Sequence, residues 1–261
     1  MSAPVDLEAG LRARRAGGAK LLVPYVMGGM TEDWVEVLSA VVAAGADAVE
    51  LGIPFSDPMM DGPVIQEASV LSLRRGTTPQ SVIDGVASAA VGVPVAVMTY
   101  YNLVYRAGHR RMARSLVAAG ISGAIVPDLP LEELGPWAEE ADEAGVATVL
   151  LVAPSTPPER VARICRRCRG FVYAVARMGV TGERAALGSD AAAVVGRIRE
   201  ATDLPVLVGV GVSTAAQAVE VCGVADGVVV GSALVRRLVE GGGVEAAAGF
   251  VGELRAALDA L

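Results

Sequence analysis

Residue types on which much enzyme chemistry depends are scarce in this sequence. Its 261 residues include one histidine, His109, one lysine, Lys20, and three cysteines. One histidine among arginines and a few scattered cysteines cannot assemble a catalytic zinc or a histidine-based general base, so we expect no metal site. Cys165 and Cys168 have redox-motif spacing, but they fall in an arginine-rich amphipathic helical stretch without a second half-site. We interpret them as two thiols on one helix face.

The sequence also lacks an excess of basic residues. Its 22 lysines and arginines stand against 29 aspartates and glutamates, which gives a formal net charge of −7 and a pI near 4.9. Nucleic acids and anionic membranes both favour a basic face, so the composition predicts neither as a partner. A small anionic ligand is compatible with this charge, because a few backbone amides can hold it.

No apolar segment is long and continuous enough to predict a membrane helix. The longest run without charge, residues 85–105, is divided by Gly92-Val93-Pro94. Proline breaks a helix, so we interpret the run as a helix end followed by a buried strand. The N-terminus shows no arginine-led apolar segment with a cleavage site, and we expect a cytoplasmic protein.

After a short helix near residues 7–15, apolar runs alternate with helical patterns at regular spacing. The expected strands are residues 21–27, 48–52, 95–99, 124–127, 148–152, 171–176, 206–210 and 228–230. The helical stretches between and after them are residues 32–44, 64–75, 110–119, 132–144, 158–169, 191–201 and 215–222. The pattern predicts an α/β protein, a single (β/α)8 TIM barrel with an extra N-terminal helix, spanning residues 1–261 as one domain. An open doubly wound sheet is disfavoured, because Gly28-Gly29 does not continue into GxGxxG.

The stretch from Glu50 to Asp61 contains the strongest catalytic signal. An apolar strand ends in Glu50, and a loop braced by Pro54 and Pro58 leads to Asp61. A carboxylate in an apolar strand is costly unless it is paired or functional. The loop can fold back and set both carboxylates over one cavity as a general acid/base pair. A structural Glu50, paired with an arginine of a neighbouring strand, is an equal alternative on this stretch alone.

Barrel enzymes carry their sites at the carboxyl ends of the strands, where Glu50 falls. Glycine-rich turns containing Gly211 and Gly231 follow the last two strands, and a helix begins at Ser232. This arrangement predicts a phosphate site built from backbone amides, although glycine can also serve close helix packing. Lys20 precedes the first strand and therefore falls at the opposite end, which argues against a Schiff-base aldolase. Carboxylates and tyrosines remain, and they predict proton transfer on a phosphorylated substrate.

Segments along nearly the whole chain resemble the α subunit family of tryptophan synthase. The resemblance is most specific from Glu50 to Gln66, and it includes Leu22-Val23-Pro24-Tyr25, Met98-Thr99-Tyr100-Tyr101-Asn102, Val126-Pro127-Asp128-Leu129-Pro130, Gly179-Val180-Thr181-Gly182 and Gly231-Ser232-Ala233. It implies a barrel that cleaves indole-3-glycerol phosphate to indole and glyceraldehyde 3-phosphate. It also implies a β subunit partner in an α2β2 heterotetramer, whose pyridoxal phosphate condenses the indole with serine. No cofactor is implied for this chain.

The resemblance also implies roles for individual residues. Glu50 would be the general acid/base at the indole C3 and the glycerol hydroxyl, and Asp61 would receive the indole N–H. The substrate-binding residues would be Tyr25, Met98, Tyr173, Thr181, Gly182, Gly211, Gly231 and Ser232. In this set Tyr25 and Met98 would form apolar walls for the indole ring, and Tyr173 would line the pocket and help to position Glu50. The glycines and serine would hold the phosphate. The threonine would contact Asp61 when a lid at residues 177–187 closes.

Three other functions share part of this pattern. A stand-alone lyase that releases free indole would carry the same site. A catalytically silent protein that only activates a β partner is disfavoured by the intact Glu50 and Asp61. A phosphosugar isomerase on the same barrel is disfavoured by the lack of a suitably placed histidine or lysine. Met59-Met60 is bulkier than the resemblance leads us to expect before Asp61, which concerns loop packing and partner coupling.

Overall fold

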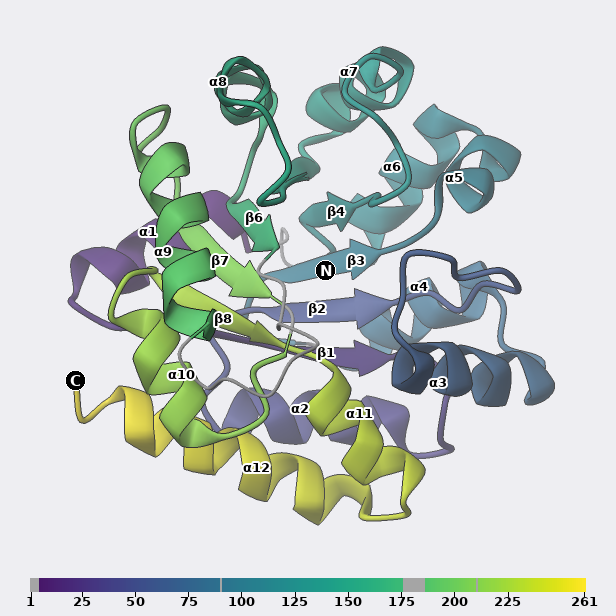
Figure 1. The fold of residues 1–261 in the computed structure, drawn as a ribbon. Helices are drawn as coiled ribbons and strands as arrows, with labels where there is room; N and C mark the ends of the chain where they lie inside the picture. Colours follow the sequence, from purple (N-terminus) through teal and green to yellow (C-terminus); the bar gives the residue numbers. More distant parts are fainter. Residues whose placement is uncertain (1–4, 90, 176–185, 210) are drawn as a thin grey trace.

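Eight parallel strands close into one barrel in sequence order (Figure 1), as the alternating pattern predicts. The computed structural model describes residues 5–89, 91–175, 186–209 and 211–261. The strands are β1 (Leu21–Met27), β2 (Val49–Gly52), β3 (Val95–Met98), β4 (Gly123–Ile125), β5 (Ala147–Val152), β6 (Val172–Val175), β7 (Val206–Gly209) and β8 (Gly227–Val230). All eight expected strands are confirmed, with ends shifted by at most two residues; residues 176 and 210 lie outside the described part.

Helices surround the barrel on all sides (Figure 1). They are α1 (Leu7–Ala16), α2 (Trp34–Ala43), α3 (Pro63–Arg74), α4 (Pro79–Ala89), α5 (Tyr101–Ala107), α6 (His109–Ala118), α7 (Gly135–Ala144), α8 (Pro158–Arg167), α9 (Ala186–Arg199), α10 (Ala215–Cys222), α11 (Ser232–Val239) and α12 (Gly243–Leu258). Because helices cover the outside of the barrel, the strands are buried on both faces and apolar nearly throughout. None of the described helices is long and apolar enough to cross a membrane.

Two helices were not predicted as complete elements. For α4 the signal was a reciprocal cap, in which Thr78 and Ser81 exchange backbone-to-side-chain hydrogen bonds of 2.9 and 3.1 Å. The short α5 begins at Tyr101, where the expected feature was a loop. Its first amide donates to Oδ1 of Asp128 at 2.9 Å, so an acceptor from another strand end helps to start this helix.

The helix α1 covers the end of the barrel formed by the amino ends of the strands. Leu7 and Leu11 are buried in the same apolar cluster as the inward-facing Phe171 and Leu207. A Cβ built on Gly123 would lie 2.6 Å from a methyl of Leu7, so a glycine in β4 makes room for the helix. The extra N-terminal helix predicted from the sequence therefore seals one end of the barrel and leaves the other end for the site.

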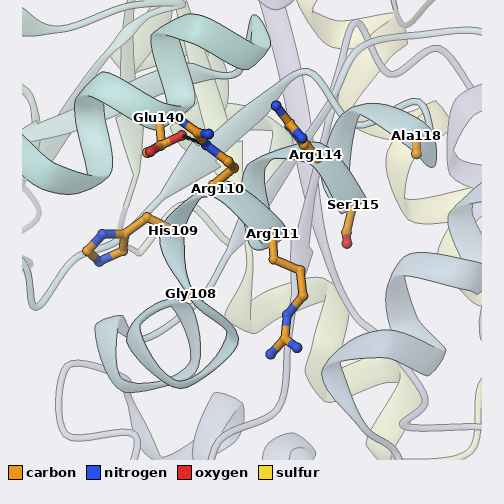
Figure 2. Close-up of a pocket in the computed structure, with 8 residues that line it drawn as sticks. All are labelled: Gly108, His109, Arg110, Arg111, Arg114, Ser115, Ala118 and Glu140. Atoms are coloured by element: carbon orange, nitrogen blue, oxygen red, sulfur yellow. Dashed lines mark hydrogen bonds and ion pairs between the residues drawn. The ribbon is translucent and has the colours of Figure 1, made fainter.

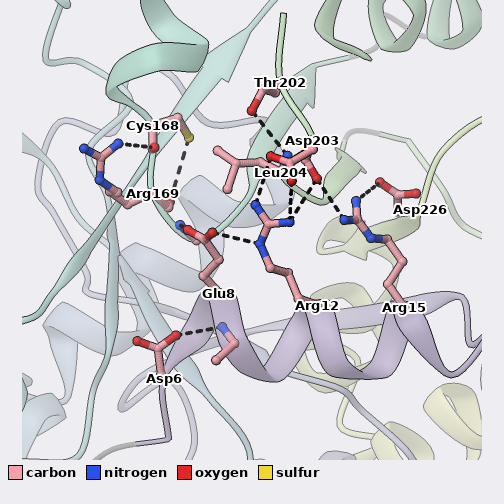
Figure 3. A network of polar contacts seen from close by, with 12 residues as sticks. Asp6, Glu8, Arg12, Arg15, Cys168, Arg169, Thr202, Asp203, Leu204 and Asp226 are labelled. Carbon is pink, nitrogen blue, oxygen red and sulfur yellow. Dashed lines mark hydrogen bonds and ion pairs between the residues drawn. The ribbon is translucent and has the colours of Figure 1, made fainter.

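Ion pairs hold α1 against the loops beneath the barrel (Figure 3). Arg12 donates to both carboxylate oxygens of Asp203, at 3.0 and 3.1 Å, and Arg15 bonds Asp226 at 3.3 Å. Lys20 lies at the same end, with Nζ 3.2 Å from the carbonyl oxygen of Ala225. This placement confirms that the single lysine is remote from the carboxyl ends of the strands.

Candidate active site

A cavity of about 290 Å³ opens at the carboxyl ends of the barrel strands. All eight predicted site residues that the structure describes contribute to its lining: Tyr25, Glu50, Asp61, Met98, Tyr173, Gly211, Gly231 and Ser232. Thr181 and Gly182, with most of the proposed lid, lie outside the described residues. The sequence interpretation did not name the remaining lining residues as site residues: Met60, Gly62, Ile65, Ile125, Pro127, Leu151, Val175 and Val229. Several of these residues could have been predicted, because alternate residues of each predicted strand face the inside of the barrel.

Glu50 lies in the wall of this cavity as a buried carboxyl group. It stands on β2 beside Tyr25 of β1, and only 1% of its surface is exposed. No arginine contacts it in the described part of the chain, and its Oε2 has no hydrogen-bond partner there. Burial, with a smaller contribution from the nearby Asp61, raises the pKa of Glu50 to about 8. The structure therefore contradicts the salt-bridged alternative and supports a carboxyl group that is protonated at neutral pH.

Asp61 reaches the same cavity from the loop between β2 and α3. This loop is tied to the barrel by Ser69, whose hydroxyl accepts from the amide of Phe55 and donates to its carbonyl oxygen, both at 2.8 Å. Oδ2 of Asp61 accepts a hydrogen bond of 2.9 Å from the hydroxyl of Tyr100. Burial raises the pKa of Asp61, and the bond from Tyr100 acts in the opposite direction. The two carboxyl groups thus have different environments, as an acid and an anionic stabiliser require.

Two tyrosines lie flat against the barrel wall because glycines on neighbouring strands leave space for them. A Cβ on Gly52 would lie 2.0 Å from the hydroxyl of Tyr25, and a Cβ on Gly209 would lie 2.1 Å from that of Tyr173. Tyr25 is buried and Tyr173 is partly buried, and desolvation raises both pKa values well above the usual range. They remain neutral at physiological pH, and the nearby carboxyl groups of Glu50 and Asp61 act in the same direction as burial.

The part of the cavity wall that follows β7 and β8 includes small residues. Gly211, with a φ of +87°, is in the left-handed region that favours glycine. Gly231 is the N-cap of α11, and without a side chain it leaves the start of the helix open at Ser232. Both residues belong to the cavity lining. A helix N-terminus at the wall of a cavity is suited to an anionic group.

A larger but shallow hollow of about 760 Å³ lies on the outside of the barrel (Figure 2). It includes Arg110, whose guanidinium bonds Glu140 at 2.9 Å, and His109, whose Nε2 lies 3.1 Å from the hydroxyl of Tyr101. His109 begins α6, one residue before the expected helical stretch of residues 110–119, and it is half-buried. No pair of carboxylates with raised pKa values lies there, so we place the chemistry in the smaller cavity despite its size.

The other candidate ligands stay apart from the cavity. Within the described residues, no three histidine, cysteine, aspartate or glutamate side chains are grouped so as to hold a metal ion. Cys165 and Cys168 are both buried free thiols, but only Cys165 lies in α8; Cys168 is the extended residue that ends this helix, so the expectation of two thiols on one helix face is wrong. Burial raises the pKa of Cys168 to about 12, which makes it a poor nucleophile.

Comparison with known proteins gives the same family as the sequence motifs. A family model described as tryptophan synthase alpha chain matches residues 11–253. The tryptophan synthase alpha chain of Streptomyces avermitilis is 46% identical over 252 residues, covering 94% of this chain and 91% of the relative. That of Halorhodospira halophila is 46% identical over 255 residues, covering 96% and 92%.

Solved structures agree with these sequence comparisons. A crystal structure of tryptophan synthase from M. tuberculosis, in an aminoacrylate-bound form, contains a chain with a TM-score of 0.88 and 38% identity, and the match covers 97% of this chain and 98% of that one. Tryptophan synthase subunit alpha of Legionella pneumophila has a TM-score of 0.90 at 30% identity, with 98% of both chains covered. The chain belongs to the tryptophan synthase alpha chain family.

Proposed function

We propose that this chain cleaves indole-3-glycerol phosphate to indole and glyceraldehyde 3-phosphate, with Glu50 as the general acid/base and Asp61 as the stabilising carboxylate. The observation that carries the proposal is the pair itself: a buried Glu50 with its pKa raised to about 8, beside an Asp61 that accepts a hydrogen bond. Membership of the tryptophan synthase alpha chain family supports the same reaction.

The reaction needs a proton donor and a proton acceptor at different stages, and one carboxyl group can serve as both. Protonated Glu50 gives its proton to C3 of the indole, and the resulting positive charge on the ring nitrogen is stabilised by ionised Asp61. The Glu50 carboxylate then takes the proton of the adjacent glycerol hydroxyl. As that oxygen forms the aldehyde, the carbon–carbon bond breaks and its electrons restore the indole ring. Glu50 ends protonated, ready for another cycle.

The cavity lining supports one orientation of the substrate. Met98 and the apolar side chains of β4 and β5 offer a surface for the indole ring beside Glu50. The phosphate would lie at the wall formed by Gly211, Gly231 and Ser232, where the N-terminus of α11 favours negative charge. Thr181 and Gly182 complete the proposed binding set. Tyr25 would form the indole wall together with Met98, and Tyr173 would line the pocket and help to position Glu50.

We further propose that the indole passes to a tryptophan synthase β subunit in an α2β2 complex in the cytoplasm. Exposed apolar side chains near the open end of the barrel are consistent with such a partner: Met59 is 88% exposed, Met60 58% and Tyr105 66%. Met60 also lines the cavity, so a partner that covers this face would lie next to the bound substrate. Pyridoxal phosphate would belong to the β subunit, and this chain would need no cofactor of its own.

The proposal is tested by incubating the purified chain with indole-3-glycerol phosphate, alone and with a saturating β subunit, and by measuring indole and glyceraldehyde 3-phosphate. We expect equal amounts of both products, slowly from the chain alone and faster with the partner. Absence of both products under both conditions would overturn the lyase assignment. Fast cleavage that the β subunit does not stimulate would instead identify a stand-alone indole-releasing enzyme.

A further inference from the structure

Tyr100 contacts the carboxylate of Asp61 from the end of β3. It follows β3 and serves as the N-cap of α5, and its hydroxyl donates to Oδ2 of Asp61 at 2.9 Å. The same hydroxyl accepts from the backbone amide of Met60 at 3.0 Å. One phenol oxygen thus holds the backbone of Met60 and the side chain of the next residue, Asp61.

The ring of Tyr100 is itself held in place. It stacks on Phe55, with ring centroids 4.9 Å apart and planes inclined by 21°. Phe55 belongs to the same loop as Asp61, and its backbone is bonded to Ser69 of α3. The hydroxyl therefore stands on a packed support, and its direction does not depend on the substrate.

The hydrogen bond determines which part of Asp61 is free for chemistry. A carboxylate has two oxygens, and Tyr100 occupies Oδ2. The indole N–H would then be accepted by Oδ1, with the carboxylate held at a fixed angle. We propose that Tyr100 is a positioning residue that orients Asp61 toward the indole nitrogen; this inference rests on the proposed role of Asp61.

The charges around Asp61 show why a donor is needed. In the described part of the chain the other ionisable groups that face it are acids: Glu50 on β2, Tyr25 on β1 and Tyr173 on β6. Burial and any ionised neighbour of this kind favour a protonated Asp61. The hydroxyl of Tyr100 is the group that acts in the opposite direction. Removing this hydroxyl should raise the pKa of Asp61, so that Asp61 ionises only at higher pH.

The test compares Tyr100→Phe with Tyr101→Phe in the full chain with saturating β subunit. The first variant keeps the stacked ring and removes the hydroxyl. The second removes a neighbouring hydroxyl that contacts His109 at 3.1 Å and not Asp61. We expect Tyr100→Phe to raise KM for indole-3-glycerol phosphate by about tenfold or more, the usual effect of losing a hydrogen bond to a charged group. We also expect the acid limb of its kcat/KM profile to move to higher pH, and Tyr101→Phe to change neither.

A third variant separates this inference from the proposed function. Asp61→Asn removes the titrating group, so adding Tyr100→Phe to it should cause no further movement of the acid limb. An acid limb in Tyr100→Phe that coincides with wild type would overturn the positioning role while leaving the lyase mechanism in place. Wild-type activity in Asp61→Asn would instead overturn the proposed role of Asp61, on which the inference rests.

Discussion

Replacing Glu50 with glutamine should remove a defined pH dependence from the stability of the protein. The pKa of Glu50 is about 8 in the folded protein, against 4.5 for an ordinary glutamate. Between these values the unfolded chain has released a proton that the native protein still binds, so the free energy of unfolding falls as pH rises. This pKa difference lowers the free energy of unfolding by about 5 kcal/mol above pH 8, and about 3 kcal/mol of it is already lost at pH 7.

Glutamine has nearly the same size as glutamate and cannot ionise, so the variant should escape this loss. We expect the stability of Glu50→Gln relative to wild type to grow by about 3 kcal/mol between pH 5 and pH 8. Denaturant unfolding of both proteins at several pH values measures the difference, in which the titration of all other groups largely cancels. A difference that stays constant over this range would show that Glu50 is already ionised in the native protein, and would refute our description of the site.

Three further predictions concern the space that Gly209 leaves for Tyr173, the chemistry, and the packing of α1 at the amino end of the barrel, called the barrel floor below. Gly209→Ala should displace Tyr173, because the new Cβ would lie 2.1 Å from its hydroxyl, and lower kcat/KM by about 10²-fold; Gly249→Ala, with no atom within 4 Å of its Cβ, should keep wild-type activity. Activity should survive a chelator, and borohydride in the presence of substrate, since Lys20 lies at the other end of the barrel; inactivation by either, with an unchanged circular dichroism spectrum, would contradict metal-free acid/base chemistry. Leu11→Ala should lower the free energy of unfolding by about 2–5 kcal/mol while leaving kcat of the folded enzyme unchanged, and a large loss of kcat would link the floor to the site.

The barrel was predictable because its signals are local and repeated. Eight apolar runs such as 21–27, with a helical pattern after each, leave few other topologies, and the structure confirms them. The two helices that were missed depend on less regular signals. The start of α5 depends on Asp128, which is far from Tyr101 in sequence, and no periodic pattern reports such a contact.

The candidate site was predictable for residues that either break a strand pattern or belong to a specific motif. Glu50 breaks an apolar strand, and Asp61 lies in the most specific motif of the chain. The contact between Tyr100 and Asp61 was not predictable, because it joins the ends of different strands through a loop conformation. The space that Gly52 provides for Tyr25 likewise becomes visible only when adjacent strands are in register.

The central claim is that Glu50 transfers the proton in the cleavage of indole-3-glycerol phosphate. The most direct test is the steady-state rate of indole formation by Glu50→Gln and wild type, each with saturating β subunit and substrate. We predict that turnover falls by at least about 10²-fold, the usual contribution of a positioned acid/base, while KM changes little. Turnover close to that of wild type, in a variant with intact fold, would remove Glu50 from the mechanism.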